Sequence, residues 1–209
     1  MSKISFMKKI ICSFLFGYLS LVQISFAQTS VWLEADRKYL LEQMMRSRDE
    51  VLTEMKGLTL AQWNFKETKD RWSIKQVVEH IAIWEMLLQH EISNSFEAGP
   101  QPERVKTAEP DSISLNFIMD TKPHHSLDYT KPFSYTIPMG LNTGKSNIAW
   151  LLKMRNESIS YLSTTKDDLR IYFNAYANIH QLFIYIFGHA DRHIRQIRKI
   201  KKATNYPVK

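Results

Sequence analysis

Proline placement is the feature of this 209-residue sequence that most constrains its fold. Six of the seven prolines and three of the six glycines lie between Glu97 and Lys145. Proline lacks a backbone N–H and breaks helices, so no long helix can run through this stretch. The chain on either side can therefore form long helices that are joined by one long connection. The six prolines are Pro100, Pro102, Pro110, Pro123, Pro132 and Pro138.

Outside the proline-rich stretch, four segments show apolar residues at helical spacing. The first runs from Ser30 to Met55 and is followed by Gly57, a stop signal. The others cover Ile74 to about Ser95, about Ser146–Leu162, and about Ile179–Lys202. Hydrophobic residues make up 44% of the chain, enough for one core. Four amphipathic helices with one long crossover predict an all-α four-helix bundle.

A local signal marks the start of the helix predicted from Ile74. Ser73 and Gln76 have the spacing of a capping box, and Trp72 and Val77 are placed to form a hydrophobic staple around it. A connection as long as the proline-rich one is expected to carry structure of its own. We expect a short helix over Ile113–Met119 that packs over the core.

The N-terminal segment has the order of a secretory signal peptide. A basic stretch precedes an apolar run from Ile10 to Val22, and Ser25 and Ala27 provide small residues for a cleavage site. The apolar run is shorter than the roughly 20 residues that a membrane-spanning helix needs. We therefore predict no stable membrane span after signal removal. The basic residues are Lys3, Lys8 and Lys9.

Cleavage after Ala27 would divide the chain into a signal peptide, residues 1–27, and an exported domain, residues 28–209, that is periplasmic or secreted. The single cysteine, Cys12, lies in the signal peptide, so any metal must be held by His, Asp or Glu. Removal of the three signal lysines takes the net charge from +7 to +4. The basic residues near the C-terminus suit a solvated helix end, with an anion or nucleic-acid stripe as the alternative, and export argues against nucleic acid.

Three histidines carry the chemistry that the sequence suggests. His189 and His193 are four residues apart, so they share one helix face and can grip one ion. Core packing also produces such pairs, and the Glu that follows the first His of a zincin motif is missing. His80 lies at the core-facing edge of another helix. Three buried imidazoles are hard to satisfy without a metal, because each needs partners for two ring nitrogens.

The other four histidines compete poorly for the same site. His90 lies on a different side of its helix from His80, and His180 lies about 180° from His189. His124 and His125 fall in the proline-rich connection, where a surface turn is expected.

Two blocks of the sequence resemble the motifs of the DinB-like superfamily. The first covers Gly57–Trp63 and Trp72–Ile81, in which a Trp-Ser cap is followed seven residues later by His80. The second, His189–Ile197, resembles the closing motif of that family, and the tail Asn205–Pro207 resembles its usual ending.

This resemblance implies an up-and-down four-helix bundle that holds one divalent metal ion through His80, His189 and His193. Some members of the family are thiol-dependent enzymes, including bacillithiol and mycothiol transferases and maleylpyruvate isomerase. The sequence departs from the family pattern in two loops. The proline common after the first Trp is absent around Asn64–Lys66, and Ala177–His180 stands where relatives often carry Pro and Gly.

Two classes of function remain open. Three histidine ligands leave a fourth position for water, as in catalytic zinc sites, which favours a metal-dependent hydrolase or transferase with a small-molecule substrate. The alternative is a non-catalytic metal- or ligand-binding bundle of the cell envelope, with a homodimer through the apolar helix surfaces as one form. Three imidazoles accept Zn, Ni, Fe or Mn.

The sequence indicates residues that lie near the candidate ligands, but it identifies no general base. Helical phase turns the side chains of Glu79, Glu85 and Asp191 away from the neighbouring histidines. One turn from the ligands lie four residues that could orient them or a substrate, of which Trp84 suits the core better. These four are Gln76, Trp84, Tyr185 and Gln196.

Overall fold

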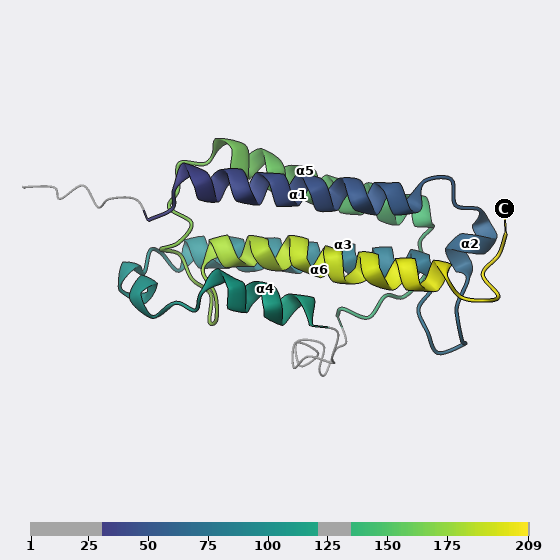
Figure 1. Ribbon diagram of the computed structural model, residues 1–209. Coiled ribbons are helices and arrows are strands. Elements are labelled where there is room, and N and C mark those ends of the chain that lie inside the picture. Colours follow the sequence, from purple (N-terminus) through teal and green to yellow (C-terminus); the bar gives the residue numbers. More distant parts are fainter. Residues whose placement is uncertain (1–30, 121–134, 209) are drawn as a thin grey trace, which may run out of the picture.

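Four long helices form the framework of the protein (Figure 1). The computed structural model describes residues 31–120 and 135–208, and these residues form six α-helices, one 3-10 helix and no strands. The all-α four-helix bundle predicted from the sequence is confirmed. The long helices are α1 (Glu34–Met55), α3 (Ile74–Glu97), α5 (Gly144–Thr164) and α6 (Ile179–Lys201).

The helix directions depart from a strict up-and-down arrangement between α3 and α5. Each long helix packs against two others, and the order around the bundle is α1, α5, α3 and α6. α1 and α6 run parallel, and Arg198 Nε donates to Glu54 Oε1 at 2.7 Å near their C-terminal ends. α3 and α5 run the opposite way, and Asn147 Nδ2 donates to the Lys75 carbonyl at 3.0 Å near their N-terminal ends. The chain therefore returns along the whole bundle between α3 and α5.

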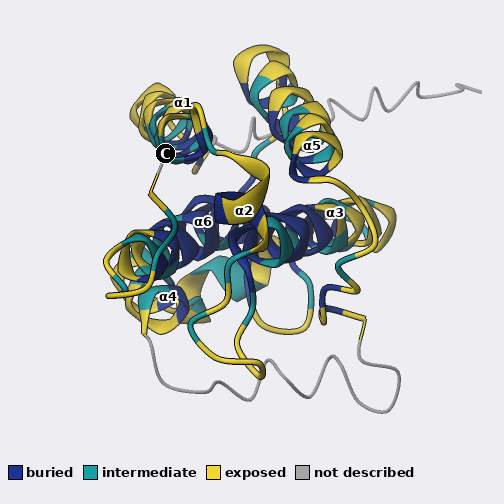
Figure 2. Cartoon of the chain, turned by 90° about the vertical axis from the view of Figure 1, so that its right-hand side faces the viewer, coloured by how far each residue is buried: buried dark blue, intermediate teal, exposed yellow. Residues whose placement is uncertain are grey.

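The described part of this return contains two short helices, η1 (Pro102–Thr107) and α4 (Asp111–Met119). α4 packs on the outer side of α6 (Figures 1 and 2), as predicted for Ile113–Met119, and begins two residues earlier. A Cβ added at Gly188 of α6 would overlap the side chain of Ile118 of α4. Gly188 therefore allows the close approach of the two helices next to His189.

Caps define the helix starts as the sequence indicated. Ser73 Oγ accepts from the Gln76 N–H at 3.4 Å, and Gln76 Oε1 accepts from the Ser73 N–H at 3.1 Å, so the predicted capping box of α3 is present. Asn178 and Gln181 form the same reciprocal pair at the start of α6. α1 begins at Glu34, four residues later than predicted. Gly57 has φ 69° just after α1 ends, which agrees with its predicted role as a stop.

Sequence reasoning did not predict α2 (Leu60–Asn64). Thr59 and Gln62 form a capping box at its start, so a local signal for it exists. The predicted signal peptide, residues 1–27, lies outside the described residues, as do His124 and His125. Among the helices of the described residues, none combines the length and the apolarity that a membrane crossing requires.

A polar layer divides the core into two apolar clusters. One cluster includes Leu40, Leu88, Leu162 and Phe183, and the other includes Val51, Val77, Leu151 and Ile197. Between them each long helix contributes a buried polar residue. Seen along the bundle (Figure 2), the buried residues of all four helices face the interior. The polar residues of the layer are Ser47 of α1, Glu85 of α3, Arg155 of α5 and His189 of α6.

Arg155 ties this layer together. Its guanidinium donates to Glu85 Oε1 at 2.6 Å and to Glu85 Oε2 at 2.9 Å. It also donates to Ser47 Oγ at 2.5 Å. Arg155 and Glu85 are each only 1% exposed, so the pair is satisfied entirely inside the bundle. His189 is the residue that α6 contributes to the same layer.

Candidate metal centre

The structure brings together the three histidines that the sequence singled out. His80 comes from α3, and His189 and His193 come from α6, which packs against α3. All three side chains are buried, with 5–6% exposure. The ring centroids of His80 lie 5.0 Å from His189 and 4.7 Å from His193, and those of His189 and His193 lie 4.4 Å apart.

Hydrogen bonds at Nδ1 orient two of the rings. His80 Nδ1 lies 2.6 Å from the Thr136 carbonyl oxygen, and His193 Nδ1 lies 2.7 Å from Gln196 Oε1. Both partners are acceptors, so each Nδ1 carries the proton and donates it. The Nε2 atom of each ring is then left with a free lone pair, which is the form of histidine that binds a metal.

One ring nitrogen from each histidine lies within 4.8 Å of those from the other two. His189 Nε2 and His193 Nε2 are 3.0 Å apart. Because Nε2 of His193 holds a lone pair, one proton on His189 Nε2 can link these two atoms. A divalent ion can replace that proton and use the three nitrogens as ligands, so the donor set fits a metal.

Burial keeps the three rings neutral. Desolvation lowers the pKa of His80 to about 4, against the opposing effect of the bond to Thr136. Desolvation also lowers the pKa values of His189 and His193 well below the usual value for histidine, and the neighbouring His80 and the charge of Arg192 lower them further. At neutral pH all three imidazoles are therefore uncharged, as metal binding requires.

Two tryptophans flank the cluster. The rings of Trp72 and His80 have centroids 4.7 Å apart, and those of Trp84 and His189 are 5.2 Å apart. Trp84 also contacts His80 edge-on at 6.4 Å. The sequence interpretation of Trp84 as a core residue is therefore incomplete, because its ring packs on two of the three histidines as well as on the apolar cluster.

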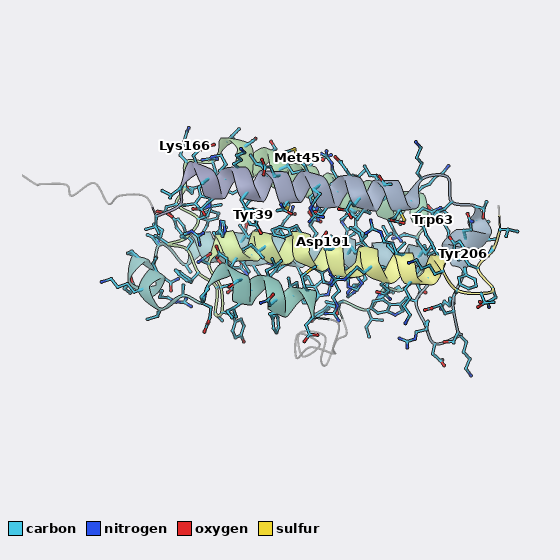
Figure 3. The ribbon with its side chains drawn as sticks, in the orientation of Figure 1. Tyr39, Met45, Trp63, Lys166, Asp191 and Tyr206 are labelled. Carbon is cyan, nitrogen blue, oxygen red and sulfur yellow. The ribbon has the colours of Figure 1, made fainter. Side chains whose placement is uncertain are left out.

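The acidic residues near the histidines in sequence are engaged elsewhere, as helical phase suggested. Glu79 accepts hydrogen bonds from backbone N–H groups of residues 139 and 140, and Glu85 pairs with Arg155. Asp191 lies on α6 and faces α1 (Figure 3), where it binds Arg46 through both carboxylate oxygens. No general base is identified among these three carboxylates.

The other described histidines lie away from the cluster, and the candidate orienting residues differ in what they contact. His90 is exposed on α3, and His180 is buried in a separate network with Trp32 and Asp111. Of the candidate orienting residues, Gln196 binds His193 directly, whereas Gln76 caps α3 and Tyr185 contacts Phe117 of α4.

Sequence reasoning missed Thr136 and the packing of Trp72 on His80. Thr136 is 56 residues from His80, and no spacing rule connects them. Trp72 was recognised only as part of the cap of α3, and its place one residue before the N-cap gave no indication that its ring would reach the second turn.

A family model and a solved structure each match most of this chain. A family model described as the DinB superfamily matches residues 43–197, a span that contains all three histidines. Among solved structures, YfiT from Bacillus subtilis matches, and it is described as a probable metal-dependent hydrolase with an unusual four-helix bundle topology. The two chains are 10% identical, the match covers 84% of this chain and 91% of that one, and the TM-score is 0.49. No curated protein matches the chain.

Proposed function

The chain belongs to the DinB superfamily, and from this premise we propose that it is an exported, divalent-metal-dependent enzyme. The reaction is hydrolysis or group transfer on a small-molecule substrate. The metal ligands in this proposal are His80, His189 and His193, and the ion is one of Zn, Ni, Fe or Mn.

The observation that carries the proposal is the state of the three-histidine cluster. Three neutral, buried imidazoles converge within 4.8 Å, and two of them hold their protons on Nδ1 through separate acceptors. A cluster with a purely structural role would gain more from hydrogen bonds to unlike groups than from three converging ring nitrogens, two of which share one proton. Three protein ligands also fall one short of the four that close a structural zinc site.

The residues of the chain would do three things at such a site. Thr136 and Gln196 fix the ring orientations of His80 and His193, and the indoles of Trp72 and Trp84 shield the rings from water. Arg192 adds positive charge close enough to lower the pKa of all three histidines. When bound, a divalent metal supplies Lewis-acid chemistry and lowers the pKa of a water or a thiol, which makes a nucleophile available near neutral pH.

A titration of the cobalt form tests this function. The Co(II) protein is titrated with azide and, separately, with a small thiol, while its visible ligand-field bands are recorded. We expect at least one of them to change the bands, because a three-ligand site has an exchangeable position. A response to the thiol favours transfer, and a response to azide alone favours hydrolysis. If neither ligand ever perturbs the bands, the site is closed and the protein is a non-catalytic metal-binding bundle.

Export is the second part of the proposal and has its own test. It is supported by the basic, apolar and small-residue segments in order before Gln28. We expect N-terminal sequencing of the protein from its native cell to begin at or near Gln28. A soluble cytoplasmic protein that retains Met1 would overturn export and leave the metal proposal standing.

A further inference from the structure

Residues 135–140 form a strap that lies against α3 beside the metal centre. Their burial alternates: Thr136 and Pro138 are buried, whereas Tyr135, Ile137 and Met139 are exposed. Thr136 is 1% exposed, so its position is set by the bundle and not by solvent. The strap is therefore docked against the bundle.

Two adjacent residues of α3 hold the strap. Glu79 Oε1 accepts from the Met139 N–H at 3.1 Å, and Glu79 Oε2 accepts from the Gly140 N–H at 2.8 Å. The next residue, His80, donates from Nδ1 to the Thr136 carbonyl at 2.6 Å. The carboxylate and the imidazole thus bind the two ends of the same short segment.

We propose that Glu79 is a positioning residue for the metal centre: it clamps the 135–140 strap so that the Thr136 carbonyl holds the proton of His80 on Nδ1. This leaves Nε2 of His80 as the ligand atom. The inference rests on the ligand set of the proposed function, but the clamp itself operates in the metal-free protein and can be tested there.

The chemistry of the clamp requires a carboxylate at position 79. Two backbone N–H donors converge on one side chain that is 4% exposed, and only a carboxylate offers two acceptor oxygens. A glutamine would turn an NH₂ group toward one of those donors. Without the clamp the strap can withdraw, and a free imidazole in solution populates both tautomers.

The backbone of the strap provides an independent way to disturb it. Gly140 has φ 70°, which side chains rarely adopt, and a Cβ there would lie 3.2–3.4 Å from the side chain of Gln76. Gly140→Ala therefore shifts the strap without altering Glu79 or His80.

The first measurement is the tautomer of His80 in the metal-free protein at neutral pH, read from long-range ¹H–¹⁵N NMR correlations of the imidazole nitrogens. We expect a single Nδ1–H tautomer in the unmodified protein and a mixture, or the Nε2–H form, in both Glu79→Gln and Gly140→Ala. The matched control is Asp191→Asn, which also removes a carboxylate within two residues of ligands but one that binds Arg46 of α1. It should leave the His80 signals unchanged.

The second measurement is Zn(II) affinity by competition with a chelator of known affinity. We expect Glu79→Gln and Gly140→Ala to weaken binding about 10- to 100-fold, as loss of outer-shell partners usually does, and Asp191→Asn to leave it within the error of the unmodified protein. If Glu79→Gln fails to fold, Gly140→Ala carries both measurements. Retention of the Nδ1–H tautomer in every folded strap variant overturns the clamp. A tautomer change in a protein that never binds metal supports the clamp and overturns the proposed function instead.

Discussion

Within residues 31–120 and 135–208, buried histidines lie in two clusters of interacting side chains, the three-histidine cluster and a cluster around His180, and these are built in opposite ways. At the end where α1 and α6 begin, His180 Nδ1 accepts from the Trp32 indole N–H at 3.0 Å. Nε2 of the same ring therefore carries the proton and faces Asp111 Oδ2 at 3.2 Å. Arg170 then bridges Asp111 and Asp36 at 2.9 and 2.8 Å. Each nitrogen of this ring has a partner of the opposite hydrogen-bonding type.

The three-histidine cluster lacks that complementarity. No ion pair joins any of its rings to a carboxylate within residues 31–120 and 135–208. One nitrogen of each ring lies within 4.8 Å of those of the other two rings, and His189 Nε2 and His193 Nε2 share one proton. The difference shows how a structural histidine can be told from a ligand. A closed network stabilises the fold by itself, whereas converging lone pairs need a cation to complete them.

The largest expected difference between the two clusters is in metal affinity. Replacement of His80, His189 or His193 by Ala should weaken Zn(II) binding by orders of magnitude, because each removes one of three ligands. His180→Ala should leave the affinity unchanged, since its ring belongs to the other network. Isothermal titration of each variant makes the measurement, with exposed His90→Ala as a control. If His180→Ala or His90→Ala weakened metal binding as much as replacement of His80, His189 or His193, the two clusters would not differ in metal binding.

The two clusters also differ in how far the sequence revealed them. The i, i+4 spacing of His189 and His193 and the motif around His80 identified the three histidines that the structure brings together, because helical periodicity converts sequence spacing into a shared face. The same argument from helical phase predicted that the side chain of Glu79 points away from His80. It could not show that Glu79 binds the backbone of residues 139 and 140. Contacts that span some 60 residues depend on where the return chain docks, which no local pattern records.

The fold shows the same limit at a larger scale. Long helices such as α3 and α6 give enough periods to be recognised, and their capping residues fix the starts. Five-residue α2 is too short for a periodic pattern, although the Thr59–Gln62 capping box marks it. The parallel course of α3 and α5 was not predicted, because the number of residues in a connection does not determine which end of the bundle it reaches.

His180 should matter for stability where it does not matter for metal. His180→Ala removes the acceptor of the Trp32 indole and the donor to Asp111, so the free energy of unfolding should fall by about 1–3 kcal/mol. Urea denaturation followed by circular dichroism gives this value. Exposed His90→Ala is the matched control and should stay within about 0.5 kcal/mol. Equal stabilities for the two variants would mean that the His180 network contributes nothing to the fold.

Removal of the metal tests how far the three-histidine cluster contributes to stability. The apolar clusters on both sides of the polar layer pack without the ion, so the chelated protein should keep its helical circular dichroism and unfold cooperatively. Metal at ten times its Kd should add about 1.4 kcal/mol, or about 3–6 °C in Tm. Thermal scans with and without chelator make the comparison. Collapse of the helical signal on chelation would assign the ion a structural role and place both clusters in the same class.

Acid should weaken the His180 cluster, and the Asp111→Asn variant separates this effect from protonation of the three-histidine cluster, whose pKa values folding also lowers. Burial by itself would raise the pKa of Asp111, but hydrogen bonds from His180 and Arg170 outweigh burial and hold the pKa below its usual value. Burial and Arg170 oppose one another at Asp36 with the same result. A carboxyl whose pKa is lowered by folding stabilises the protein above its unfolded pKa of about 3.9, and this contribution is lost as the pH falls.

The unfolding free energy of the metal-free protein should therefore decline as the pH falls through about 5 toward 2, because protons bind the unfolded chain first. Asp111→Asn should be less stable than the unmodified protein at neutral pH and should show a shallower decline, since one of the two titrating carboxylates is gone. Urea unfolding at a series of pH values measures both slopes. Parallel slopes would show that Asp111 has the same proton affinity in the folded and unfolded states, and the closed network would then owe its stability to Trp32, His180 and Arg170 without help from the ionised carboxylate.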